Sequence, residues 1–435
     1  MDIKGYSHIP RALYDAITFL AKALPKRSVP TFLELLFGAM LTQHGFVTEA
    51  WLAIKPRRHW TSYFKWVQKG HWSWVALGLQ TARLALQNVP QKRCFVAIDD
   101  TVIFRCSRKA PESRIHHQHG CKTNRPVYVR GQNWVTIAVV LSQGWRSLAL
   151  PLLSRLPRAT GNGGKLVAAK TLLRVSKRLF AGRWVTLLVD SWYMRKTLLI
   201  PAQVMGYQVI GQVRKDTALY LPPPPHNGKR GRPRKYGDRL TPERVKTLPV
   251  VSQHVFLYND WHRVHYRSCV ALARFLNGQP VRVVWSQIEN KDGTLRQPRL
   301  ILSTDLQLSA MRTLMAYGRR WSIEDLFNQL KNRWGWKDAW QQSRQVLHRW
   351  TQILSTSYAI PQLLAQQNTD DVKVIASIAP WRHNQPITAG RVRLGLQRIF
   401  GHIDIRSLWN PKSGKFEAKI DSDKPDRPPD RRNAA

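Results

Sequence analysis

Between residues 94 and 213 the chain alternates short apolar segments with amphipathic ones, and this order constrains the fold more than any other feature. Cys94–Arg105, Trp134–Ser142 and Trp145–Leu153 have strand-like composition, and Gly144 between the last two predicts a hairpin. The segments that follow predict a helix, a strand, a helix and a strand: Lys165–Phe180, Trp184–Asp190, Met194–Met205 and Tyr207–Val213. Three sequential strands followed by such alternation predict an α/β sheet with strands of mixed direction.

The segments on either side of this pattern differ from it in composition. Leu13–Leu24 and Phe32–Leu41 have apolar residues at helical spacing, and Trp51–Trp74 interleaves aromatic residues with bases. We therefore predict a helical N-terminal DNA-binding domain. The domains expected along the chain are this one at 1–90, an α/β core at 91–214 and 304–340, a β-rich insertion at 215–303, a helical C-terminal region at 341–420 and a disordered tail at 421–435.

The chain is strongly basic, with 69 Lys and Arg against 26 Asp and Glu, which gives a formal net charge of +43. This excess predicts a polyanionic partner. A membrane partner is not expected, because the longest apolar runs end well short of the roughly 20 residues that a spanning helix needs. The four cysteines form no CxxC pair, which favours a reducing, cytoplasmic environment.

Acidic residues are scarce in this chain, so an acid at the end of an apolar strand is informative. Asp99 and Asp100 follow the apolar run CFVAI, and Asp190 follows WVTLLV. Ligand sites form at the carboxyl ends of strands in α/β sheets, and a carboxylate buried there needs a partner. A divalent metal ion is one candidate, and a neighbouring arginine is the other.

A third acid lies on a predicted helix that runs from Ser309 to about Arg333. At 100° per residue, Tyr317, Arg320, Glu324 and Lys331 fall within an arc of about 60°. An apolar stripe lies beside this arc, so the helix is expected to dock by one face and present the four polar side chains next to it. A glutamate between two bases in this position fits a metal ligand with phosphate-binding groups on either side.

The spacing Tyr317-x2-Arg320-x3-Glu324-x6-Lys331 resembles the Tyr-Arg-Glu-Lys signature of bacterial insertion-sequence DDE transposases, in the cut-and-paste group. The Asp99-Asp100-Thr101 turn resembles the first catalytic acid of that family, and Asp190 resembles the second. A β-rich insertion between the second Asp and the Glu is also the family's arrangement. The resemblance covers about residues 95–335.

The resemblance implies an RNase H-like fold in which Asp99, Asp190 and Glu324 are catalytic and hold two Mg²⁺ (or Mn²⁺) ions for attack on a phosphodiester. Asp100 is the alternative to Asp99, because only one of two adjacent strand residues points to the site, and the spacing to Thr101 favours Asp99. Arg320 and Lys331 are expected to bind phosphates, and Tyr317 to position the DNA strand.

Further DNA contacts are expected elsewhere in the chain. The stretch Lys229–Lys235 has the Gly-Arg-Pro core of an AT-hook, a shape that suits a narrow minor groove, and the bases expected to bind are Arg230, Arg232, Arg234 and Lys235. Trp285 and Trp321 are candidates for stacking on a flipped base. The Cys106–Cys121 stretch is predicted to be a basic loop near the active site.

The leading prediction is a bacterial, nucleoid-associated DNA transposase. It would bind the inverted-repeat ends of its element as a homodimer, cleave double-stranded DNA there as an endonuclease, and join the 3′-OH to target DNA by recombination. Two alternatives are a catalytically silent DNA-binding protein derived from such a transposase and a stand-alone RNase H-like nuclease. A protein that only binds DNA has no need of three acids in so basic a chain.

Overall fold

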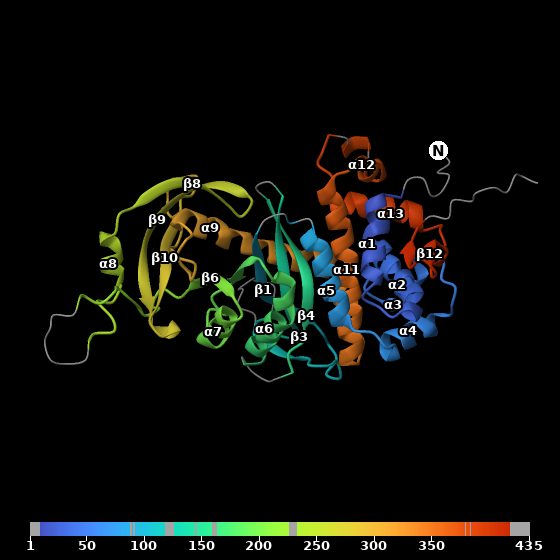
Figure 1. Ribbon diagram of the computed structural model, residues 1–435, viewed down its shortest axis with the longest axis horizontal. Coiled ribbons are helices and arrows are strands. Elements are labelled where there is room, and N and C mark those ends of the chain that lie inside the picture. The colour runs from blue at the N-terminus through green and yellow to red at the C-terminus, as the bar shows by residue number, and fades with distance from the viewer. Residues whose placement is uncertain are drawn as a thin grey trace, which may run out of the picture.

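The structure is a computed structural model. It describes residues 9–417 except 88, 90–91, 118–125, 144–145, 159–162, 226–232, 379 and 383. The predicted turn at Gly144 and the predicted tail 421–435 lie outside the described residues. Along the long axis of the molecule, the helical N- and C-terminal regions lie at one end, the insertion strands at the other, and the core strands between them (Figure 1).

Five strands form the centre of a mixed sheet, in the spatial order β4–β3–β1–β5–β6. Their bounds are β1 (Arg93–Phe104), β3 (Tyr128–Gln143), β4 (Arg146–Arg155), β5 (Trp184–Val189) and β6 (Tyr207–Val213). β3 is antiparallel to both β1 and β4, whereas β1, β5 and β6 are parallel. The helices α6 (Gly163–Ser176) and α7 (Lys196–Val204) make the connections. The predicted α/β class with an RNase H-like core is confirmed.

The register of two parallel strands places two of the predicted acids. Ile98 of β1 pairs with Val189, which is the last residue of β5. Asp99 and Asp190 therefore both come directly after this pair, at the carboxyl side of adjacent strands. This is the edge of a parallel sheet at which ligands usually bind.

The 215–303 segment extends the same sheet. β11 (Arg299–Ser303) pairs antiparallel with β6, and β10 (Gln279–Ile288), β9 (Asp260–Ala273) and β7 (Leu219–Tyr220) continue outward. β8 (Val251–Leu257) pairs with β9, and α8 (Pro242–Thr247) lies beyond these strands (Figure 1). β2 (Arg114–His117) was not predicted: it pairs with β3 within the stretch that the sequence predicts as a loop.

The helical regions from the two ends of the chain pack against each other (Figure 1). The N-terminal helices are α1 (Arg11–Ala21), α2 (Val29–Leu41), α3 (Val47–Leu52), α4 (Trp60–Lys69) and α5 (Trp74–Gln87). The C-terminal elements are α11 (Arg344–Gln367), α12 (Asp370–Ala376), α13 (Ala389–Phe400), β12 (Trp409–Asn410) and β13 (Lys415–Phe416). α11 is long and almost wholly buried, because α2, α5, α13 and β4 all pack on it.

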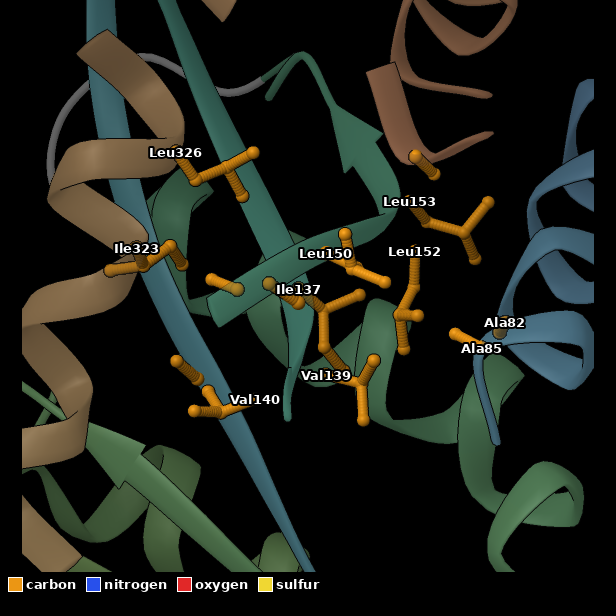
Figure 2. Close-up of a cluster of buried hydrophobic side chains, with 14 of the residues drawn as sticks. Ala82, Ala85, Ile137, Val139, Val140, Leu150, Leu152, Leu153, Ile323 and Leu326 are labelled. Carbon is orange, nitrogen blue, oxygen red and sulfur yellow. The ribbon is translucent and has the colours of Figure 1, made fainter. Parts of the chain in front are cut away.

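The predicted Ser309–Arg333 helix is divided into α9 (Ala310–Gly318) and α10 (Ser322–Arg333) by a 3-10 turn at 319–321. Figure 2 shows how α10 is held: Ile323 and Leu326 face the β3–β4 pair from one side, and Ala82 and Ala85 of α5 lie on the other. These side chains are buried, as are Ile137, Val139, Val140, Leu150, Leu152 and Leu153 between them. Glu324, next to Ile323, is therefore carried by a helix whose rotation is fixed by the core.

Several bases lie inside the protein and contact backbone carbonyls. Arg349 donates to the carbonyls of Val67, Gln68, Gly70 and Trp72. Arg393 donates to those of Met40, Thr42 and Arg333, and Arg105 to those of Phe104, Lys337 and Ala339. These buried guanidinium groups join distant segments, so part of the positive charge serves the fold and does not face a ligand. Within the described residues, no helix is long and apolar enough to cross a membrane.

Candidate active site

Asp190 lies at the end of β5, where the chain turns toward α7. Its Oδ1 accepts the backbone N–H groups of Trp192, at 3.0 Å, and Tyr193, at 3.1 Å. These bonds fix the direction of the carboxylate, as an Asx turn does. Burial raises the pKa of Asp190, and the N–H bond from Tyr193 opposes this rise.

Asp99 is the most strongly perturbed acid of the site. Its side chain is 15% exposed, and Arg320 Nη1 donates to its Oδ2 at 2.8 Å. Burial raises the pKa of Asp99 to about 7, Arg320 opposes the rise, and the neighbouring Asp190 and Asp100 add to it. The three carboxylates are thus close enough to repel one another, which is the condition that a cation relieves.

Glu324 is linked to Asp99 by Arg320, which contacts both carboxylates. Arg320 Nη2 lies 2.6 Å from Glu324 Oε1, one turn along the chain, while Nη1 binds Asp99. The guanidinium is 12% exposed and lies 5.8 Å from the centre of the Tyr317 ring. Arg320 therefore bridges two acids that are far apart in the sequence.

Asp100 points to a different set of partners. Lys165 Nζ lies 3.1 Å from both of its carboxylate oxygens, Tyr193 donates its hydroxyl at 2.9 Å, and Asn133 donates its amide at 2.7 Å. Adjacent residues on a strand point to opposite sides, so Asp99 and Asp100 do not share partners. Lys165, Tyr193 and Asn133 were not predicted as site residues, because they come from α6, the turn after β5, and β3, with no common spacing.

Lys331 and Tyr317 are also brought close to the core strands. Lys331 Nζ contacts Thr101 Oγ1 at 2.9 Å, two residues after Asp99 on β1. Tyr317 is buried, and its hydroxyl lies 3.5 Å from Gln212 Oε1 on β6. Arg320 and Lys331 of the signature therefore contact β1, and Tyr317 contacts β6, even though a 3-10 turn interrupts their helix.

The two tryptophans lie in different surroundings. Trp321 is 46% exposed and contacts the ring edge of Tyr258, with 5.9 Å between centroids. Trp285, on β10, lines a separate cavity of about 220 Å³ with bases that include Lys215 and Arg267. Of the AT-hook-like bases, Arg230 and Arg232 lie outside the described residues, whereas Arg234 and Lys235 are exposed.

A cleft of about 510 Å³ opens beside the acids. Asp99, Asp100 and Asp190 line one part of it. Its other lining residues include Lys165 and Trp192, together with Arg114, His116 and His117 of β2. A basic segment from the Cys106–Cys121 stretch therefore does lie next to the acids, as a strand where a loop was expected; His119 and Cys121 fall outside the described residues.

The donor set fits a hard divalent cation in its chemistry, since Asp99, Asp190 and Glu324 offer only carboxylate oxygens. Among the residues that the structure describes, no three His, Cys, Asp or Glu side chains converge closely enough to hold an ion. The physical reason is visible in the contacts above: Arg320 lies between Asp99 and Glu324 and satisfies one oxygen of each.

Comparison with known families gives one match. Residues 20–271 match the family described as DDE superfamily endonuclease. The matched stretch contains Asp99 and Asp190, and Glu324 lies beyond it. No curated protein matches the chain.

Proposed function

We propose, from the premise that this chain belongs to the DDE superfamily of endonucleases, that it is a DNA transposase that cleaves insertion-sequence ends and joins the 3′-OH to target DNA. One observation carries the proposal: Asp99 and Asp190 line a cleft that bases also line, and Arg320 joins Asp99 to Glu324 from a distant segment. DDE endonucleases act on DNA and typically use divalent metal ions.

We assign Asp99, Asp190 and Glu324 as the ligands of two Mg²⁺ or Mn²⁺ ions. When bound, such ions would activate the attacking hydroxyl and stabilise the leaving oxygen. Asp190 is already oriented by two backbone N–H groups, and α10 is held against the sheet, so two of the acids are positioned by the fold. Asp99 is preferred to Asp100, because Asp100 is engaged by Lys165, Tyr193 and Asn133.

The bases around the acids take the DNA. Arg320 and Lys331 are assigned to phosphates, because Arg320 in the 3-10 turn and Lys331 on α10 flank Glu324 and both contact β1. Tyr317 positions the strand through its contact with Arg320. Trp321 and Trp285 are assigned to base contacts, and Arg230, Arg232, Arg234 and Lys235 to a minor groove.

We propose that the helical region 1–90 recognises the ends of the element and that a homodimer assembles on double-stranded DNA. The core is assigned to 91–214 and 304–340, the insertion to 215–303 and the C-terminal region to 341–420. The alternatives are a silent DNA-binding derivative and a stand-alone nuclease. The first is disfavoured because it would have no use for three acids gathered round one arginine.

The test uses linear DNA that carries the element's ends, with Mg²⁺, Mn²⁺ or EDTA. Wild type is compared with Asp99→Asn, Asp190→Asn and Glu324→Gln, and with Asp325→Asn as the matched control, since Asp325 is the exposed neighbour of Glu324 on α10. We expect cleavage and strand joining only with metal, loss in the first three variants, and retention in the control.

Other outcomes separate the alternatives. Tight binding without cleavage by wild type would support the silent derivative. Cleavage of unrelated DNA at the same rate, without joining, would support the nuclease. Asp100→Asn that loses cleavage while Asp99→Asn keeps it would reverse the assignment of the first acid.

A further inference from the structure

A hollow on the helical end of the molecule is lined by aromatic side chains that have no role in the proposed chemistry. Its volume is about 570 Å³, and it lies between α3, α4 and the chain that leads into α11. We call it the aromatic groove; its aromatic members are Phe46, Trp60, Phe64 and Trp340, and Gln68, Gln341 and Gln342 lie beside them. The four aromatic residues are between 39% and 64% exposed. Four large apolar side chains around one hollow are a marker of a binding surface.

The groove is built on fixed parts of the fold. Trp340 donates its indole N–H to the Lys337 carbonyl at 2.8 Å, and its ring lies 6.4 Å from that of Phe46. The residue before Phe46 is tied on both sides: Gly45 N–H donates to Asp338 Oδ2 at 3.1 Å, and its carbonyl accepts the indole N–H of Trp350 at 2.6 Å. Because the polar atom of Trp340 is already bonded, its carbon face is what the groove presents.

The surroundings of the groove are positively charged. Residues 53–69, which lead into and form α4, contain five Lys and Arg and no Asp or Glu. Lys55, Arg58, Lys65 and Lys69 of this stretch are exposed, and so is Lys337, three residues before Trp340. Asp338 is turned inward to Gly45. The occupant must therefore bring negative charge together with flat apolar faces.

We propose that the aromatic groove binds unpaired nucleobases of a DNA strand. Inside a duplex both faces of a base are covered by its neighbours, so exposed rings stack only on bases that have a free face. The glutamines offer donors and acceptors to base edges. A second copy of this chain suits the groove poorly, because its surface is as basic as the groove itself, with 69 bases against 26 acids.

The groove is mechanically joined to the strand that carries the catalytic acids. Arg105, directly after β1, donates to the Lys337 and Ala339 carbonyls next to Trp340. Asp99 lies six residues before Arg105. At the rise of about 3.3 Å per residue of a strand, the distance between Asp99 and Arg105 is on the order of 20 Å. A strand held in the cleft therefore has a path of a few nucleotides to the groove. This inference rests on the proposed function in one respect: the choice of DNA as the nucleic acid that binds the aromatic groove.

The test compares two probes that carry the same phosphates: a labelled 12-residue oligothymidylate and a 12-residue strand of abasic sites. Binding of the full-length protein is measured in EDTA, so that no cleavage is needed. Wild type should prefer the strand with bases. Trp60→Ala/Phe64→Ala should lose about 5- to 150-fold of affinity for oligothymidylate, the range for the stacking of one base on an aromatic side chain, with little change for the abasic strand.

The matched control is Trp381→Ala, which removes a tryptophan that is 80% exposed elsewhere on the helical region. It should bind both probes as wild type does, and Trp60→Phe should keep most of the preference. Equal losses on both probes would mean that the variant disturbs charge or folding, and an unchanged preference would mean that bases do not enter the groove; either result overturns the proposal. A shift from dimer to monomer in the variant, with the preference kept, would assign the groove to a protein contact instead.

The two proposals fail separately. If wild type does not cleave element ends, but its preference for the strand with bases is lost in Trp60→Ala/Phe64→Ala, the proposal for the aromatic groove is supported and the proposed transposase activity is contradicted. If cleavage depends on Glu324 while both probes bind alike, the reverse holds.

Discussion

Arg320 donates to Asp99 at 2.8 Å although 221 residues separate them in the chain, and the same guanidinium binds Glu324 at 2.6 Å. This one side chain joins Glu324 of α10 to Asp99 of β1. The Asp99 side chain is 15% exposed and that of Glu324 is 37% exposed. The burial-induced rise in the pKa of Asp99 is opposed by its contact with Arg320. The geometry of the acids and the stability of the core are therefore coupled.

Replacing Arg320 by Met should unfold the core more easily, because it leaves Asp99 buried without its cation. Loss of one partner of a buried pair typically costs about 3–5 kcal/mol, and the lower end applies here since Glu324 is partly exposed. Thermal unfolding of Arg320→Met, Asp99→Asn and the double variant forms a cycle. The double variant should recover part of the loss; strictly additive losses would contradict a direct pairing.

His348 should make stability depend on pH. Its Nε2 accepts the Leu156 N–H at 3.2 Å and its Nδ1 donates to the Arg344 carbonyl at 2.8 Å, so the folded state holds the neutral ring. Burial lowers the pKa of His348 to about 4, against 6.5 for the unfolded chain. The contribution of the neutral ring to the free energy of unfolding is complete above pH 6.5 and is lost as the pH falls toward 4. In this range the unfolded chain binds a proton at His348 that the folded chain does not bind.

At 1.36 kcal/mol per pKa unit, the loss is on the order of 3 kcal/mol. His348→Gln keeps one donor and one acceptor but does not titrate. Denaturant unfolding at pH 7.5 and pH 5 should therefore show a smaller drop for this variant than for wild type, with the exposed His71→Gln as control. Equal drops in all three proteins would show that His348 is not the titrating group.

Gly45 and Gly335 allow the N-terminal helices to approach the end of α10. A Cβ on Gly45 would lie 1.7 Å from the Gly335 carbonyl oxygen, and Gly335 itself has φ +68°. Gly45→Ala should cost about 3 kcal/mol or more, because two backbones must separate. In Gly163→Ala the new Cβ meets nothing within 4 Å, so its melting temperature should stay close to that of wild type. A melting temperature of Gly45→Ala equal to that of the control would refute the close approach.

DNA binding should weaken steeply with salt, since phosphate contacts release counterions. Arg234→Ala/Lys235→Ala should lower the slope of log K against log salt by about 1 to 2, if both exposed bases contact phosphate. Arg349→Met should leave that slope unchanged below its melting temperature, because Arg349 is buried against carbonyls. A flat salt response of wild type, or an equal slope change in both variants, would mean that the charge has been misassigned.

The sequence alone predicted the order of the core elements, because the periodicity of apolar residues is a local property that each segment keeps in the fold. β1, β3, β4, α6, β5, α7 and β6 occur where the pattern placed them. The spacing of Tyr317, Arg320, Glu324 and Lys331 likewise predicted a polar face beside an apolar stripe. The spacing did not predict the 3-10 turn at 319–321, because the 100° rotation per residue assumes a regular α-helix throughout.

What the tertiary structure decided was which distant groups meet. Strand register places Asp99 beside Asp190, and the packing of Ile323 and Leu326 fixes the rotation of α10, which carries Glu324. Lys165 at Asp100 and the arginines bonded to carbonyls leave no trace in local spacing. The net charge of +43 states the excess of bases over acids, but it does not say which bases are buried and which are exposed to a ligand. Burial and pairing depend on contacts between segments that are distant in the sequence.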